Sequence, residues 1–142
     1  METIDCKTAT LRMLDKSVLL VTMKEDAEVD LAAAIENYEA AMRLTNGSRY
    51  VSLVDARKYT TITDEGRKYA LQDKMYTHVI AQAVVITSLA TRLLANFLMQ
   101  FTKKNKVVEM KLFNNYDVAF NWLQEKLVKE EMLMASDSLK EL

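Results

Sequence analysis

Segments with strand-like spacing of apolar residues alternate along this chain with segments of helical spacing, and this alternation limits its fold more than any other feature. Residues 8–14 alternate apolar with polar side chains, and residues 17–23 are rich in Val and Leu. With only Asp15-Lys16 between them, the two runs predict a β-hairpin. Further short apolar runs predict strands over 50–54, 80–86 and 107–113, the last nearer the edge of the sheet because polar residues alternate within it.

Helical spacing is clearest after the hairpin. Leu31, Ile35, Tyr38 and Met42 recur at i, i+4, i+7 and i+11, the apolar stripe of an amphipathic helix. We expect Asp30 to cap this helix and Asn46-Gly47 to end it. Further helices are predicted over 64–77, from a cap at Ser88 through Phe101, and from Asn115 onward, the last one burying Val118, Ala119, Trp122 and Leu123.

Strands joined by crossover helices require right-handed connections and largely parallel pairing. We therefore expect an α/β fold with a five-stranded mixed, mostly parallel sheet, an N-terminal β-hairpin and four main helices. The expected domain spans 1–127, and 128–142 form a C-terminal amphipathic helical tail. The apolar stripe of that tail consists of Val128, Met132, Ala135, Leu139 and Leu142.

The tail stripe has to be covered, and the sequence leaves three outcomes open. The tail folds back on its own sheet, it frays where 136–138 interrupt the stripe, or it packs against a second copy to form a homodimer.

Composition excludes several classes of function. Nineteen basic and twenty acidic residues give a net charge of −1, which favours neither nucleic acid nor an anionic membrane surface. Cys6 is the only cysteine, so no intramolecular disulfide can form, and we expect it in a mobile N-terminal segment. No apolar run approaches the roughly 20 residues that span a bilayer. We expect a cytoplasmic protein without membrane insertion, and with no nucleic acid, metal or cofactor bound.

The residues available for catalysis are few. His78 is the one histidine and falls where a predicted helix meets a strand, where a boundary role is expected. Gly47 and Gly66 are the only glycines, too few for a glycine-rich phosphate loop. We therefore expect a binding module and no enzyme, with any acid or base role left to Asp55 or Glu65.

Polar side chains concentrate in residues 55–67, directly after a buried strand. Ligands and partners of parallel α/β sheets gather at the carboxyl ends of the strands, where this segment begins. A structural reading also holds, because Thr63 fits a helix N-cap and acidic residues after it favour the positive helix start. The candidate partner-binding residues are Asp55, Arg57, Thr61, Thr63, Asp64, Glu65 and Arg67.

The element order and this segment resemble the STAS domain, the fold of bacterial anti-sigma-factor antagonists, and in particular its small, poorly characterised bacterial relatives. In antagonists an Asp ends the third strand, and the glycine of a D-S-S-G sequence follows eleven residues later. Asp55 and Gly66 keep that spacing, but Glu65 stands where the family carries its phosphorylated serine. The run from Val108 to Leu123 is similar to the end of such domains.

The resemblance implies a non-catalytic regulatory or protein-binding module that cannot be phosphorylated at residue 65. The related CRAL-TRIO architecture binds lipids in an apolar pocket. It implies an alternative function as a carrier or sensor of an apolar small molecule, held between the sheet and the helix that contains 93–101.

Overall fold

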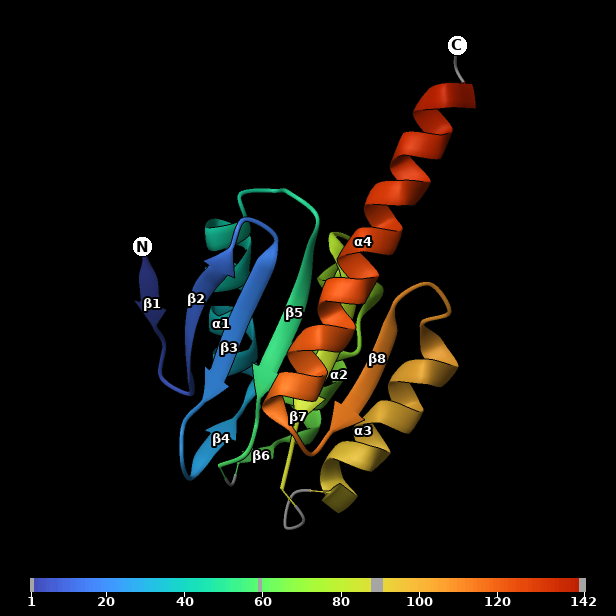
Figure 1. Cartoon of the computed structure of the whole chain (residues 1–142). Coiled ribbons are helices and arrows are strands. Elements are labelled where there is room, and N and C mark those ends of the chain that lie inside the picture. Colours follow the sequence, from blue (N-terminus) through green and yellow to red (C-terminus); the bar gives the residue numbers. More distant parts are fainter. Residues whose placement is uncertain (1, 59, 88–90, 141–142) are drawn as a thin grey trace.

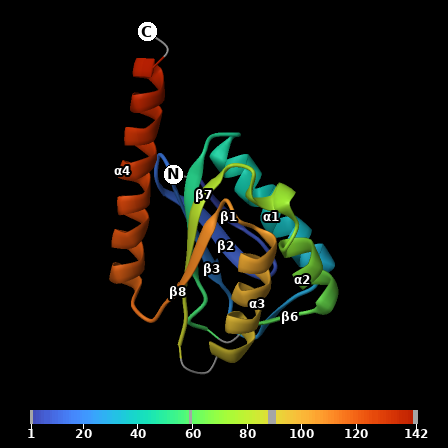
Figure 2. The same cartoon turned by 90° about the vertical axis from the view of Figure 1, so that its right-hand side faces the viewer.

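The computed structural model describes residues 2–58, 60–87 and 91–140, with the backbone alone for 91–95. A mixed β-sheet forms the middle layer of the molecule (Figure 1). Three helices cover one face of this sheet, and the C-terminal helix lies alone on the other face (Figure 2). The predicted α/β class is therefore confirmed.

The main sheet has the strand order β1-β2-β3-β5-β7-β8. The first two neighbouring pairs are antiparallel and the next three are parallel, so the sheet is mixed and mostly parallel as predicted. The prediction of five strands was wrong, because β1 is too short to show a periodic pattern. The strands are β1 (Thr3–Asp5), β2 (Ala9–Asp15), β3 (Val18–Met23), β5 (Tyr50–Asp55), β7 (Val79–Val85) and β8 (Glu109–Phe113).

A second, two-stranded sheet lies at the carboxyl ends of β3 and β5. It pairs β4 (Ala27–Val29) with β6 (Thr60–Ile62) in parallel. The sequence did not indicate either strand. Because β6 belongs to residues 55–67, part of the predicted loop is a strand held in place by backbone hydrogen bonds.

The first helix, α1 (Leu31–Thr45), has the predicted ends. The Asp30 carboxylate accepts a hydrogen bond from Ala33 N at 2.8 Å, and Asn46 closes the helix in the left-handed conformation at φ 51°. Its predicted apolar face is found in part, since Leu31 is exposed whereas Ile35, Tyr38 and Met42 are half-buried. The helix packs on the sheet with small side chains, which let the two backbones approach closely: Ala33, Ala34, Ala40, Ala41 and Thr45 are the buried residues.

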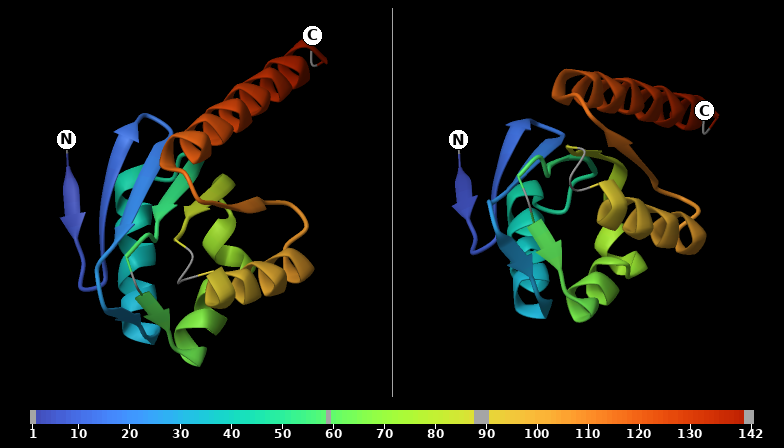
Figure 3. Two further views of the ribbon diagram at one scale, coloured as in Figure 1. Left: turned by 60° about the horizontal axis from the view of Figure 1, so that its bottom comes forward. Right: turned by 90° about the horizontal axis from the view of Figure 1, so that it is seen from below.

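The predicted helix over 64–77 is shorter and divided. It consists of α2 (Asp64–Ala70) followed by a 3₁₀ turn, η1 (Asp73–Tyr76). The next helix, α3 (Thr91–Lys104), follows β7 and packs on the same face of the sheet as α1 and α2 (Figure 3). The predicted cap Ser88 lies outside the described residues.

The last helix, α4 (Tyr116–Lys140), packs across β5 and β7 with Ala119 and Leu123 fully buried. The prediction that Val118 is buried was wrong, because Val118 is 54% exposed. Trp122 is half-buried on the flank, with its ring 5.4 Å from that of Phe113. The face of α4 that contacts the sheet is therefore narrower than the apolar stripe predicted from the sequence of this helix.

Beyond the sheet, α4 continues without a break through 136–138 and projects away from the body (Figure 1). Every side chain of 131–140 is exposed, so this part of the helix neither folds back on the sheet nor frays at the predicted interruption. Among the described residues no helix is both long and apolar enough to cross a membrane.

Candidate functional site

Two of the predicted site residues form an ion pair at the carboxyl end of β5. Arg57 donates from Nε to Asp55 Oδ1 at 2.9 Å and from Nη2 to Oδ2 at 2.7 Å. The guanidinium also lies 5.4 Å from the centre of the Tyr116 ring, in the first turn of α4. Both carboxylate oxygens are engaged, so this pair links the end of the strand to the start of the last helix.

The ion pair also determines the charge of Asp55. Hydrogen bonds from Arg57 hold the pKa of the Asp55 carboxyl below its usual value, although partial burial acts in the opposite direction. A general acid or base works best with a pKa near the pH of the reaction. Asp55 therefore stays ionised and paired, a state that suits structure better than proton transfer.

Thr63 and Gly66 join α2 to the second sheet. Thr63 N donates to Val29 O at 3.0 Å, and Thr63 Oγ1 accepts from Gly66 N at 3.1 Å as the predicted N-cap. A Cβ on Gly66 would overlap Val29 O and lie 3.2 Å from Asp30 O. The start of α2 can approach β4 this closely only because residue 66 has no side chain.

The acidic residues in the first turn of α2 face outward, whereas Arg67 reaches across to α3. Arg67 donates to Gln100 Oε1 of α3 at 2.8 Å and lies 3.4 Å from the Asp64 carboxylate. The Asp64 side chain is 88% exposed, and Glu65 is exposed as well.

The seven predicted residues thus form two separate groups. Asp55 and Arg57 pair at the end of β5, whereas the others lie along β6 and the start of α2. Across the residues that the structure describes, no hydrogen bond or ion pair joins the groups. Thr61 belongs to β6 and lines a cavity that the sequence did not reveal.

That cavity lies between the sheet and the three helices that cover it, and we call it the helix-side cavity. It has a larger chamber of about 240 Å³ and a smaller chamber of about 150 Å³. Together they reach the lower end of the size range of small-molecule sites, about 300–1,000 Å³. The two chambers share Met23, Val29, Val54, Ile62, Ala70, Gln82 and Phe97 as walls.

The walls are mostly apolar, and the polar side chains among them, such as Asn37, Ser52, Thr61 and Gln82, are uncharged. Within the described part of the chain, no Asp, Glu, Lys, Arg or His lines either chamber. The larger chamber adds phenol rings, of which Tyr38 and Tyr69 meet edge to face at 6.4 Å. Burial raises the pKa of Tyr50 to about 12 and that of Tyr76 further, so both phenols stay neutral at physiological pH. The cavity suits an uncharged, apolar occupant.

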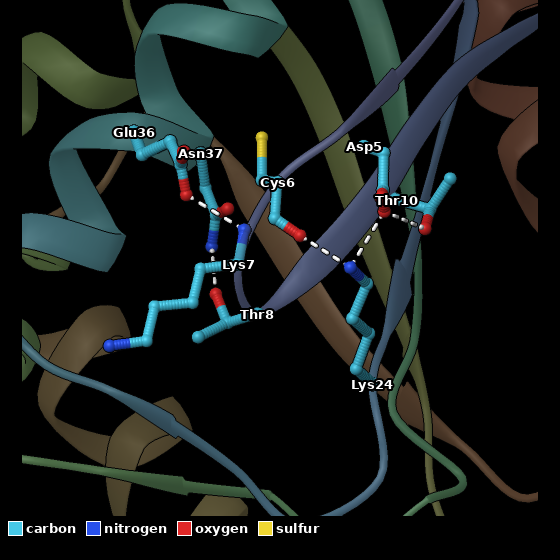
Figure 4. Close-up of polar contacts among 8 residues, drawn as sticks. All are labelled: Asp5, Cys6, Lys7, Thr8, Thr10, Lys24, Glu36 and Asn37. Atoms are coloured by element: carbon cyan, nitrogen blue, oxygen red, sulfur yellow. Dashed lines mark hydrogen bonds and ion pairs between the residues drawn. The ribbon is translucent and has the colours of Figure 1, made fainter.

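Cys6 does not lie in a mobile segment as predicted. It is 3% exposed, between β1 and β2, and its carbonyl accepts from Lys24 Nζ at 2.6 Å (Figure 4). The next residues are tied to α1, since Lys7 N donates to Glu36 Oε1 and Asn37 Nδ2 donates to Thr8 Oγ1. Burial, with a smaller contribution from nearby carboxylates, raises the pKa of the Cys6 thiol, so the reactive thiolate is disfavoured.

His78 directly precedes β7, and its carbonyl accepts from Tyr50 N at 3.0 Å. This is the boundary position that the sequence predicts. In the described ranges, no group of three or more His, Cys, Asp and Glu side chains could hold a metal ion.

The fold and the helix-side cavity define a class of protein: a mixed-sheet α/β fold with a partly open, mostly apolar space between the sheet and its helices. Residues 12–127 match the family described as "Domain of unknown function (DUF7793)", and the chain belongs to that family. No curated protein matches the chain. The matched span ends at Leu127, before the exposed part of α4.

Proposed function

We propose that this protein is a non-catalytic module that binds an apolar small molecule in the helix-side cavity, as a carrier or sensor. The mostly apolar, uncharged lining of two adjoining chambers is the observation that carries this proposal. It also agrees with the resemblance to STAS-like domains and to the pocket of the CRAL-TRIO architecture. The single histidine and the balanced charge favour a binding role over catalysis or nucleic-acid recognition.

Titration with N-phenyl-1-naphthylamine, an uncharged dye that fluoresces in apolar surroundings, tests this proposal. Ala34 lies on α1, is 7% exposed and lines the larger chamber, whereas Ala32 of the same helix is exposed. We expect saturable binding to the natural protein, weaker binding to Ala34→Leu and unchanged binding to Ala32→Leu. No saturable binding, or equal binding to both variants, would refute the proposal. Ala70→Leu, in the wall shared by both chambers, provides a second variant if Ala34→Leu folds poorly.

A second candidate function is protein binding through residues 55–67. After the internal pairs have formed, Asp64 and Glu65 remain at the surface at the start of α2. The glutamate at the family's phosphoserine position would then keep the surface in a permanently charged state. We expect Glu65→Gln and Glu65→Ser to lose partners that the natural protein retains from a lysate of its own cells. Unchanged retention by both folded variants would remove this candidate.

We further propose that two copies associate through the exposed part of α4. Met132 and Leu139 are 67% and 69% exposed, on a stripe with Val128 and Ala135. Their alternating spacing of four and three residues is that of a helix-pairing seam, and two-fold pairing of identical surfaces is the commonest form of assembly. We also propose a cytoplasmic location, which the single, buried thiol supports.

A further inference from the structure

The floor of the helix-side cavity contains a polar pair in apolar surroundings. Ser52 of β5 and Gln82 of β7 are partners in the parallel register of the sheet. Their neighbours along the strands, such as Leu53 and Ala83, pack in the opposite core under α4. Because successive side chains of a strand point to opposite faces, Ser52 and Gln82 both point toward α1, α2 and α3. Both line the larger chamber, and Gln82 lines the smaller one too.

This pair has few partners within the protein. Ser52 is 4% exposed and lines the larger chamber. In the wall of the same chamber, Asn37 Oδ1 of α1 is buried with no hydrogen-bond partner among the described residues. Gln82 Nε2 lies 3.9 Å from the Met110 sulfur, a weak acceptor, and Gln82 Oε1 accepts no hydrogen bond within the described ranges. A polar group left unpaired at a buried site costs free energy, and this cost is smaller for Gln82, which is only half-buried. A ligand that supplies the missing hydrogen bonds recovers part of that cost.

The surroundings of Ser52 and Gln82 favour an uncharged ligand. A carboxylate or ammonium group placed here would lose its hydration without meeting an opposite charge, because none lines the described walls. A hydroxyl group fits, since its hydrogen can be donated to Gln82 Oε1 while its oxygen accepts from Ser52 Oγ. The apolar remainder would lie against the aromatic and aliphatic walls.

We infer that the helix-side cavity selects uncharged, hydroxyl-bearing apolar molecules, whose hydroxyl group binds between Ser52 and Gln82. This inference rests on the proposed function and names the chemical class of its ligand. It predicts a preference among molecules of the same shape that differ in a single polar group.

Three matched probes test the preference: 2-naphthol, naphthalene and 2-naphthoate, each titrated into the full chain at neutral pH. One hydrogen bond contributes about 0.5–1.5 kcal/mol, so we expect 2-naphthol to bind roughly two- to tenfold more tightly than naphthalene. We expect 2-naphthoate to bind more weakly than both. Equal affinity for 2-naphthol and naphthalene, or tighter binding of 2-naphthoate, would overturn the inference and leave the apolar-ligand function standing. Failure of all three to bind would overturn both.

Substitutions of Ser52 and Gln82 test whether the hydroxyl group of 2-naphthol binds between these two residues. We expect Ser52→Ala and Gln82→Met each to reduce the preference for 2-naphthol over naphthalene, because each removes one of the two hydrogen-bonding groups and keeps an apolar wall. The double variant should bind the two probes equally. Neither single variant should lower the melting temperature, since neither polar group has a strong partner in the protein. A preference for 2-naphthol that is undiminished in both single variants, or that persists in the double variant, would place its hydroxyl group elsewhere and overturn the inference.

Discussion

At the scale of single residues, the absence of a side chain at Gly66 determines how α2 meets the rest of the fold. Alanine normally stabilises a helix interior by about 1 kcal/mol relative to glycine. Here the added Cβ would overlap the carbonyl oxygen of Val29 and crowd Asp30. Backbone atoms cannot rotate out of the way as side chains do, so steric repulsion exceeds the helical preference.

We therefore predict that Gly66→Ala lowers the free energy of unfolding by about 1–3 kcal/mol. Chemical denaturation followed by circular dichroism measures this change. Glu65→Ala, at the exposed preceding position of α2, is the matched control and should stay within about 0.5 kcal/mol of the natural protein. A stabilised Gly66→Ala would mean that α2 does not lie this close to β4.

The ion pair of Asp55 with Arg57 leads to a prediction about how stability depends on pH. Because Arg57 lowers its pKa in the folded state, the stabilisation from this pair is present above the unfolded pKa of about 3.9. It is lost as the pH falls through the lower folded value. We expect Asp55→Asn to reduce stability at pH 7 by at most about 1 kcal/mol, because Arg57 is half exposed.

Denaturation midpoints at pH 7 and pH 2.5 measure the effect. The difference between Asp55→Asn and the natural protein should shrink at the lower pH. Asp64→Asn, at a side chain that is 88% exposed, provides the comparison. A difference for Asp55→Asn that is the same at both pH values would contradict the predicted role of its charge.

At the scale of helices and strands, the sequence predicts those features that depend on neighbouring residues alone. The caps of α1 at Asp30 and Asn46 were predicted correctly, because each depends on residues within one turn. The buried face of α1 was predicted only in part. The alanines that pack most closely on the sheet are less apolar than the half-buried Ile35, Tyr38 and Met42, so the pattern did not single them out. Short strands such as β4 and β6 depend on pairing between distant segments, so three residues of sequence cannot reveal them.

In the candidate site too, features that depend on neighbouring residues were predicted and those that depend on tertiary packing were not. Thr63 was predicted as a cap from its neighbours alone and is one. The helix-side cavity depends on how three helices pack on one sheet, and no periodic pattern encodes such a space. The polar residues Ser52 and Gln82 within apolar strands were the available signal, because a fully buried strand rarely keeps an unpaired polar side chain.

The packing of α4 yields a prediction about two of its residues, Leu123 and Trp122. Leu123 is fully buried, so Leu123→Ala should cost about 2–5 kcal/mol. Trp122 is only half-buried beside Phe113, so Trp122→Ala should cost less despite the larger side chain removed. Denaturation of both variants compares the costs directly. A larger loss for Trp122→Ala would place the tryptophan in the core of the fold.

At the scale of the whole molecule, the projecting part of α4 makes the protein longer than its sheet requires. Ten consecutive exposed residues at the end of this helix include Met132, Leu133, Met134 and Leu139. Exposed apolar residues so close together on one helix favour association. The proposed seam contains Met132 and Leu139, whereas Leu133 lies beside it.

We predict that light scattering gives the mass of a dimer for the full chain and of a monomer after removal of residues 131–142. Met132→Lys should weaken the dimer, because it places a charge in the seam. Leu133→Lys changes a side chain of similar exposure outside the seam and should leave the dimer intact. A monomeric full chain, or equal effects of the two substitutions, would refute this mode of association.

The two outer strands of the main sheet have a further consequence for how molecules meet at high concentration. Strand edges left unpaired attract other strands and seed fibrous aggregates unless they are short or charged. At one edge, β1 has three residues and ends at Asp5, which pairs with Lys24. At the other edge, β8 exposes Glu109 and Lys111 in alternation with buried residues. Both edges thus resist the addition of a strand from another chain, so we expect crowding not to extend the sheet from one copy to the next.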